Sequence, residues 1–465
     1  MLFASIEYLV FLPLVVALYW AAPGRYRNAF LLLASYVFYM SFVPIYGVLI
    51  FGLAISNYAL GLWLSRSGRP RAVLALAIAL DLGVLVFFKY TNFVIAEASR
   101  LTGADHSWFT LQVILPLGIS FFTFEFIHYV VDIYRGSVPI HDFTNFHLFA
   151  SFFPSQIAGP IKRFQPFNAQ LVPRPRFDPA LFEQGVWLIA RGMAKKVALA
   201  DQLAPLVATA FTPGAVPSPL SAWLGAYAFA LQIFFDFSGY TDIGRGSAQL
   251  FGYRLPENFA MPYLARGIRD FWRRWHMSLS SWLRDYLYIP LGGNRGGNQR
   301  TALNLLITMA LGGLWHGASG HFVAWGMYHG ALLVGERALA ARAPAAVRQF
   351  SSTTLGRVAA VALTFHIVTL GWVLFRAPSL IDALRYVSSM FGFQGGEPTV
   401  PFGPVAFVAL VYALGLVLER FAPSVFSTES GSRRGALRAT ALAGIVLGTV
   451  VLIPQTVARF IYFQF

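Results

Sequence analysis

The 465-residue sequence contains no cysteine and few charged residues. The absence of cysteine excludes disulfide bonds, thiolate metal sites and a cysteine nucleophile. Charged residues make up only 12% of the chain, about half the fraction that soluble domains usually carry. The low charge fraction therefore indicates a chain that is surrounded mainly by lipid.

Apolar residues take the place of charged ones. They form 57% of the chain, and the mean hydropathy is +0.60. Runs such as VLIFGLAISNYALGLWL and AVLALAIALDLGVLVFF approach the roughly 20 apolar residues that a helix needs to cross a bilayer. About eleven such runs are spread over the whole chain. We therefore expect an all-α polytopic membrane protein with one domain, residues 1–465, and additional re-entrant or interfacial helices.

The net charge is +15, and the positions of the basic residues predict how the chain is oriented in the membrane. A soluble protein with this charge would be a candidate for nucleic-acid binding, but cytoplasmic loops of membrane proteins also collect Lys and Arg. Arg25 and Arg27 follow the first apolar run, and the loop around Pro44 is uncharged. The loop after the third run is basic again, between Arg66 and Arg71. This alternation places the N-terminus outside, and we expect no nucleic-acid partner.

Residues 269–295, RDFWRRWHMSLSSWLRDYLYIPLGGNR, combine tryptophan and arginine in a pattern that predicts one interfacial helix. One face of that helix would carry an aromatic stripe, namely Trp272, Trp275, Leu279, Trp282 and Tyr286. The neighbouring stripe would carry Arg269, Arg273, Ser280 and Arg284. We expect the aromatic rings to face acyl chains, with His276 on the border between the stripes. The arginines either anchor the helix at lipid headgroups or also steer an anionic, phosphate-bearing donor.

Several carboxylates lie close to apolar runs. Asp236 and Asp242 occur in FFDFSGYTDIGRG, and at membrane depth they must face protein or a water-filled cavity. One interpretation is that they cap broken helices and bind buried backbone groups. Glu125, His128 and Asp132 share one face of a predicted helix in FEFIHYVVDIYRG. They could line a cavity or bind Arg135 and its neighbours, and we favour the structural role.

Residues 311–330, LGGLWHGASGHFVAWGMYHG, place histidines between two apolar runs. Gly313 and Gly317 are four residues apart, a spacing that lets helices pack closely, and Gly326 and Gly330 repeat it. We therefore expect His316 on a tightly packed helix.

The three histidines of this stretch receive different interpretations. A buried imidazole bonded to a carbonyl is the structural alternative for His316. An ionisable group inside a membrane bundle is nevertheless a functional candidate, and a neutral imidazole can accept a proton from a hydroxyl during acyl transfer. His321 follows a GASG break and is expected at a helix end. We assign His329, on the next helix, a polar packing role.

The order of several motifs resembles a known family. DFSGYTD, NFAMPY, FWRRWHMSLSSWLRDYLYIPLGGNR, LGGLWHG and WGMYHG follow one another as in the membrane-bound O-acyltransferases. The chain is more closely similar to the bacterial branch that contains the membrane subunit of alginate O-acetylation. MLFASIEYLVFLPL, FFKYTNF, LPLGISFFTFEFIHYVVDIYRG and FPSQIAGPIKRF also fit that branch. The resemblance runs from residue 1 to about residue 340 and continues more loosely to the end.

This resemblance implies a helical bundle around a central funnel, with a catalytic core at about residues 230–340. It implies that His316 is the principal catalytic residue and that His276 is the second polar residue of the active site. It further implies acetyl transfer to an exported polysaccharide, such as alginate or cellulose, in the bacterial inner membrane. A periplasmic acetyltransferase or another part of the polysaccharide-synthesis machinery would be the partner.

The residue chemistry agrees with this implication. A thioester donor such as acetyl-CoA needs little activation, whereas a hydroxyl acceptor needs a base, for which His316 is suited. His276 would orient the acceptor or stabilise charge, and Arg273 and Arg274 either bind a donor phosphate or are structural. Trp315 and Asp236 are further substrate-binding candidates. We expect neither a metal nor a tightly bound cofactor, and the lack of a GxSxG motif favours direct transfer over an acyl-enzyme, without excluding an acyl-histidine.

Two alternatives remain open. Within the same chemistry, the acyl group could be D-alanine destined for teichoic acid. In a different class, the chain could be a polysaccharide or proton-coupled transporter in which His316 and His276 relay protons. No inverted repeat is visible in the sequence, which argues against a typical secondary transporter.

Overall fold

The computed structural model describes residues 1–103, 110–112, 114–156, 159–342, 344–394, 396–421, 442–449, 452 and 460–461. The described elements are helices, apart from one isolated bridge between Pro217 and Glu397, which confirms the all-α prediction. The chain divides into two compact units: residues 1–189 with 240–256, and residues 190–239 with 257–465. That the chain forms a single functional domain stays a prediction.

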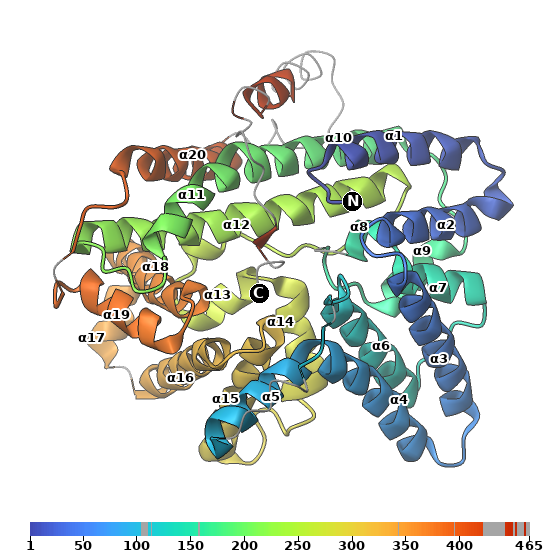
Figure 1. Cartoon of the computed structure of the whole chain (residues 1–465), viewed down its shortest axis with the longest axis horizontal. Helices are drawn as coiled ribbons and strands as arrows, with labels where there is room; N and C mark the ends of the chain where they lie inside the picture. The colour runs from blue at the N-terminus through green and yellow to red at the C-terminus, as the bar shows by residue number, and fades with distance from the viewer. Residues whose placement is uncertain are drawn as a thin grey trace. The chain divides into compact units, whose positions relative to one another are not determined.

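The helices of the first unit are coloured from blue to green in Figure 1. They are α1 (Ile6–Ala21), α2 (Arg27–Met40), α3 (Tyr46–Arg66), α4 (Pro70–Leu85), α5 (Thr91–Thr102), α6 (Ile119–Tyr134), α7 (Phe143–Ser151), α8 (Phe153–Gln156), α9 (Phe164–Leu171) and most of α10 (Pro179–Met193). Helix α6 packs on both α3 and α4. Nearly all residues of α6 are buried, including its polar side chains.

The polar side chains of α6 are satisfied inside this unit. Glu125 forms a buried ion pair with Lys162 at 2.7 Å. The ring Nε2 of His128 accepts a hydrogen bond from the main-chain N–H of Phe164 at 3.2 Å. Asp132 lies 3.8 Å from Arg135. These contacts agree with a structural role for the three residues, although only Asp132 lies beside Arg135, as the sequence predicted.

The second unit contains the remaining helices. They are α11 (Asp201–Ala210), α12 (Pro219–Leu250), α13 (Ile268–Arg274), α14 (Met277–Leu283), α15 (Gly297–His316), α16 (Gly320–Arg342), α17 (Ala345–Ser352), α18 (Thr354–Arg376), α19 (Leu380–Met390) and α20 (Phe402–Phe421). Helix α12 continues unbroken through Asp236 and Asp242 and ends in the first unit. The interpretation that these two carboxylates cap broken helices is therefore wrong. The helix stays intact at Asp236 because this carboxylate pairs with Lys196 in the interior.

Four described helical segments are long and apolar enough to cross a membrane. They are Tyr46–Arg66, Pro70–Thr102, Pro219–Leu250 and Thr354–Arg376. Two shorter apolar helices, Ile6–Ala21 and Phe402–Val417, accompany them. The chain is a membrane protein, while the count of about eleven spans stays a prediction.

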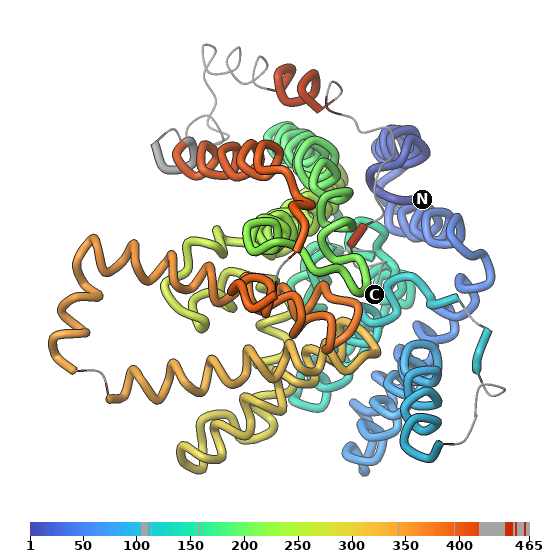
Figure 2. Tube along the Cα trace, turned by 60° about the vertical axis from the view of Figure 1, so that its left-hand side comes forward, coloured from blue at the N-terminus to red at the C-terminus, as the bar shows by residue number. Residues whose placement is uncertain are grey.

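Helices α15 and α16 lie side by side, and α18 also packs on α16 (Figures 1 and 2). A Cβ atom on Gly313 would lie 2.1 Å from the main-chain oxygen of Phe322, and one on Gly326 would lie 2.1 Å from that of Met309. No larger residue fits at these distances, so the glycines allow the two backbones to touch. The close packing predicted from the glycine spacing is confirmed.

Candidate active site

The segment that carries His276 is two short helices with a sharp turn between them. Helix α13 ends at Arg274, α14 begins at Met277, and His276 has a left-handed backbone with φ of 44°. The prediction of one continuous helix is therefore wrong. Residues other than glycine adopt this conformation rarely, and such strained positions cluster at functional sites.

Asn258, from the NFAMPY motif, holds this turn in place. Its main-chain oxygen accepts a hydrogen bond from the N–H of Met277 at 3.0 Å. Its side-chain Oδ1 accepts another from the Ser278 hydroxyl at 2.6 Å. These bonds replace the helical hydrogen bonds that the periodic pattern predicted. Sequence analysis did not identify Asn258 as a site residue, because its partners lie far from it in the chain.

Three members of the aromatic stripe are buried, whereas the arginine stripe lines a cavity. Trp275 and Leu279 are each only 1% exposed and Trp282 is 6% exposed. The prediction that the aromatic stripe faces acyl chains is therefore wrong, since these side chains pack into the protein. The arginine stripe remains together in space, because all four of its members line one cavity: Arg269, Arg273, Ser280 and Arg284.

Three of the predicted site residues meet in the interior of the second unit. His316 is the last residue of α15 and is buried. The ring of Trp315 lies 4.9 Å from the His316 ring and 6.1 Å from the His276 ring, between centroids. The ring of Phe237, from α12, lies 4.6 Å from that of His276. Residues from three of the motifs, DFSGYTD, FWRRWHMSLSSWLRDYLYIPLGGNR and LGGLWHG, thus converge on one aromatic enclosure.

His276 is fully buried at the turn between the two helices. Burial lowers the pKa of its imidazole to about 3, so the ring is neutral near pH 7. Neither ring nitrogen has a hydrogen-bond partner on another residue in the described part of the chain. A neutral imidazole offers one donor and one acceptor, and buried polar groups normally have partners. The ring is therefore suited to bind a polar group that enters this enclosure.

His329 belongs to the same enclosure. The ring of Trp325 lies 5.1 Å from His316 and 5.1 Å from His329, and so contacts both. His329 is fully buried, and within the described residues neither of its ring nitrogens has a hydrogen-bond partner. The polar packing role predicted for it accounts for its burial but not for its unpaired nitrogens. His321, by contrast, lies at the start of α16 beside Ser319, as predicted for a helix end.

Asp236 belongs to a buried cluster of charges beside this enclosure. The Lys196 ammonium lies 2.9 Å from the carboxylate of Asp236 and 2.8 Å from that of Asp201. Burial alone would favour the neutral amine, but the two carboxylates raise the pKa of Lys196 above its ordinary value. Asp236 also accepts a hydrogen bond from the main-chain N–H of Ile461 at 2.8 Å. Asp236 is thus held by a network that sequence analysis missed, although a buried carboxylate signals that a cation lies nearby.

The arginine-lined cavity has a volume of about 620 Å³. Arg269, Arg273, Arg284 and Arg337 line it, together with Trp272. The Trp272 ring lies 5.7 Å from that of Trp325, the ring that contacts His316. The cavity therefore adjoins the histidine enclosure through two tryptophan side chains that meet edge to face.

The two adjacent arginines of the WRRW motif differ in their surroundings. Arg273 lines the arginine-lined cavity and, among the described residues, forms no ion pair. Arg274 is absent from the described lining of that cavity; it pairs with Asp270 at 2.8 Å and donates to the main-chain oxygen of Ala260.

Across the described residues, no group of three or more His, Asp or Glu side chains is placed to hold a metal ion.

The model of the membrane-bound O-acyltransferase family matches residues 137–375, which include the histidine enclosure and the arginine-lined cavity. The chain belongs to this family. It is 43% identical over 403 residues to the probable alginate O-acetylase AlgI of Pseudomonas aeruginosa, which covers 84% of this chain and 75% of the relative. It is 34% identical over 407 residues to a peptidoglycan O-acetyltransferase of Helicobacter pylori, with 81% and 76% coverage.

A more distant relative is a teichoic acid D-alanyltransferase of Streptococcus thermophilus. It is 34% identical over 232 residues, which is 47% of this chain and 56% of the relative. These similarities identify the protein as an O-acyltransferase and agree with the resemblance that its motifs predicted.

Proposed function

We propose that the protein transfers an acetyl group from a cytoplasmic thioester donor to an exported polysaccharide of the alginate or cellulose type. The convergence of His276 and His316 on the Trp315 ring, next to an arginine-lined cavity, carries this proposal. The most similar of the relatives described above acts on alginate, which supports a polysaccharide acceptor. The D-alanyltransferase relative matches a shorter part of the chain, and so supports D-alanine transfer less well.

In this proposal His316 acts as the base. Its imidazole accepts the proton of the acceptor hydroxyl while that oxygen forms a bond with the acyl carbon of the thioester. The carbon–sulfur bond then breaks, and the imidazolium returns the proton to the departing thiolate. His276, neutral at pH 7, donates a hydrogen bond to the developing oxyanion or orients the acceptor. The transfer is direct, with no covalent enzyme intermediate.

The donor enters through the arginine-lined cavity. A donor such as acetyl-CoA carries phosphate groups, which guanidinium groups bind in a bidentate manner. Arg273 forms no ion pair in the described part of the chain, so we assign it to the donor phosphate. Arg274 is paired with Asp270, so we assign it to holding α13. Trp315 separates the two histidines, and Asp236 supports the wall next to Phe237.

The acceptor is reached from the opposite side of the bacterial inner membrane. The acceptor hydroxyl at His316 would belong to a periplasmic acetyltransferase or another component of the polysaccharide-synthesis machinery, which then passes the acetyl group to the polymer. No tightly bound cofactor or metal takes part in this proposal.

The proposal is tested by the acetyl content of the exported polysaccharide in cells that carry the wild type, His316→Ala or His276→Ala, at equal membrane levels. We expect acetyl ester to be lost while polymer secretion continues. His321→Ala is the matched control, because this histidine lies in the same stretch but outside the enclosure. Loss of secretion itself in the His316 variant would instead support the transporter alternative.

A further inference from the structure

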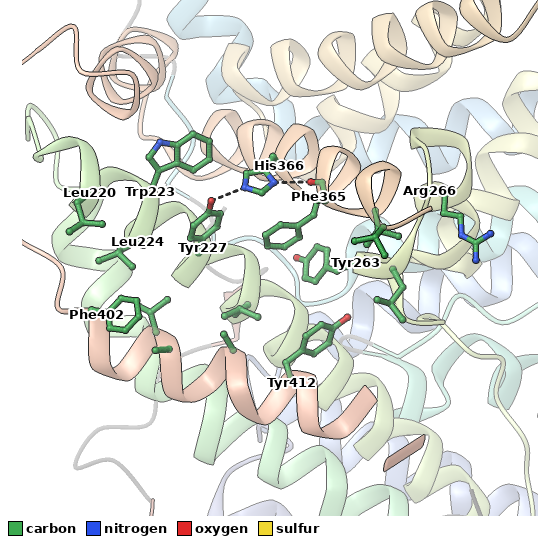
Figure 3. A pocket seen from close by; sticks show the side chains of 18 of the residues that line it. Leu220, Trp223, Leu224, Tyr227, Tyr263, Arg266, Phe365, His366, Phe402 and Tyr412 are labelled. Carbon is green, nitrogen blue, oxygen red and sulfur yellow. Dashed lines mark hydrogen bonds between the residues drawn. The ribbon is translucent and has the colours of Figure 1, made fainter. Parts of the chain in front are cut away.

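A second cavity, of about 1030 Å³, lies between α12, α18 and α20 (Figure 3). It shares no lining residue with the arginine-lined cavity. Its walls are apolar and aromatic, and include Trp223 from α12, Phe365 from α18 and Phe402 from α20. Its volume is at the upper end of the roughly 300–1,000 Å³ typical of ligand pockets. Two of the helices that line it, α12 and α18, are candidate membrane spans, so we call this cavity the lateral groove.

Two arginines give the lateral groove a positive charge. Arg266 and Arg357 are the charged side chains among its described lining residues, and no carboxylate accompanies them. Arg357 lies in the first turn of α18, and its guanidinium donates back to the main-chain oxygen of Thr353 and the hydroxyl of Thr354. Arg357 lies in the first turn of a membrane span, and its side chain points back toward the start of the helix. This arrangement places its charge at the depth of lipid headgroups.

A polar pair lies deeper in the same groove. His366 follows Arg357 by nine residues, or roughly 14 Å along the axis of α18. Its Nε2 lies 2.9 Å from the hydroxyl of Tyr227, and its Nδ1 lies 2.7 Å from the main-chain oxygen of Ala362 (Figure 3). His366 is exposed in the groove although it belongs to a span. Polar side chains at this depth commonly mark a ligand pathway.

We propose that the lateral groove binds one anionic glycerophospholipid. The phosphate binds Arg266 and Arg357, and an acyl chain lies along Phe365 and the other aromatic walls. The Tyr227–His366 pair contacts the ester region or a kinked part of the chain. A zwitterionic lipid fits less well, because the described lining contains no carboxylate to receive its amine. Bulk lipid that merely fills an apolar surface would show no headgroup preference.

The lipid would also contact the segment that carries the active site. The ring of Tyr263 lines the groove and lies 6.2 Å from that of Trp275, the residue before His276. Arg266 lies in the short connection between Tyr263 and α13. Binding at the groove would therefore order the connection that leads into the His276 turn.

The test is native mass spectrometry of the full chain from mixed micelles with equal amounts of dioleoyl-phosphatidylglycerol and dioleoyl-phosphatidylethanolamine. Both lipids carry a phosphate, but the two arginines repel the ammonium group of phosphatidylethanolamine, which predicts roughly tenfold more bound phosphatidylglycerol. The variant Arg266→Gln/Arg357→Gln should lose this preference. Ala409→Phe, which places a ring in the groove at an exposed alanine, should reduce the binding of both lipids.

The matched control is Arg69→Gln/Arg71→Gln, which removes the same charge from two exposed positions at the start of α4 in the other unit. It should keep the preference of the wild type. The proposal is overturned if the groove and control variants retain the same preference, or if Ala409→Phe binds as much phosphatidylglycerol as the wild type. Thermal unfolding confirms that each variant is folded, and Ala362→Phe replaces Ala409→Phe if the latter is not.

Discussion

The buried imidazole of His276 makes the stability of the protein depend on pH. The folded-state pKa is about 3 and the ordinary value is 6.5, so the unfolded chain binds an extra proton between these two values. The stability that depends on a neutral ring is therefore complete above pH 6.5 and is lost as pH falls toward 3. Between pH 7 and pH 5 the loss is about 2 kcal/mol. We expect the unfolding temperature of the wild type in nonionic detergent to fall further over this range than that of His276→Asn.

The other histidines are present in both proteins, so the difference between their pH dependences reports on His276 alone. His141→Asn, at an exposed position, is the control and should follow the wild type. Equal decreases for the wild type and His276→Asn would show that the ring is not held neutral by burial.

The ammonium group of Lys196 compensates two buried carboxylates. Replacing it by Met keeps the length of the side chain but leaves Asp201 and Asp236 buried without their cation. Breaking a buried ion pair in this way costs about 3–5 kcal/mol. We expect Lys196→Met to lower the unfolding temperature strongly, whereas Lys195→Met, at the adjacent and less buried position, should have a small effect. If the triple variant Lys196→Met/Asp201→Asn/Asp236→Asn is no more stable than Lys196→Met, the unpaired carboxylate charge is not the cause of the destabilisation by Lys196→Met.

At the scale of single residues, the motifs and the glycine spacing predicted which histidines belong to the candidate site and which helices pack closely. His316 and His276 were identified by their motifs, and the structure brings both to Trp315. Asn258 and Lys196 were not identified as members of the site, because their roles depend on partners distant in the chain. Such partners leave no mark on the local periodicity of the residues that they bind.

At the scale of helices, the close contact of α15 and α16 depends on glycine at one face of each helix. A Cβ atom on Gly326 would lie 2.1 Å from the Met309 oxygen, whereas one on Gly335, in the same helix, would meet nothing within 4 Å. Alanine is favoured over glycine inside a helix by roughly 0.5–1 kcal/mol. Gly335→Ala should therefore stabilise the protein slightly, while Gly326→Ala should destabilise it and reduce activity by displacing His316. A Gly326→Ala protein that melts at or above the wild-type temperature would contradict this account of the packing.

The helical segments also show where periodicity is a poor guide. The stripe pattern of residues 269–288 is a good helical pattern, yet the chain turns at His276, because Asn258 binds the groups that would continue the helix. Conversely, the polar residues after Phe234 suggested a break, yet α12 continues because its polar side chains find partners in the interior. In both cases tertiary contacts, which a single sequence does not reveal, determine the outcome.

At the scale of the whole molecule, the distribution of arginine predicts how the chain crosses the membrane. The loop with Arg25 and the loop that ends near Arg71 should be cytoplasmic, and the uncharged loop around Pro44 should face outward. Helix α3, between the second and third of these loops, is one of the four candidate spans. The orientation matters for the proposed reaction, because donor and acceptor must arrive from opposite sides.

Because the chain has no cysteine, single introduced cysteines report this orientation without background. We expect Pro44→Cys to react with a membrane-impermeant maleimide in intact spheroplasts, and Gly68→Cys to react only after lysis. A Cβ at Gly68 meets no atom within 4 Å, so the substitution should not disturb the fold. Labelling of both positions after lysis is the control for accessibility. The reverse pattern would place the basic loops outside, and the arginine distribution would then reflect interactions other than the cytoplasmic bias of basic loops.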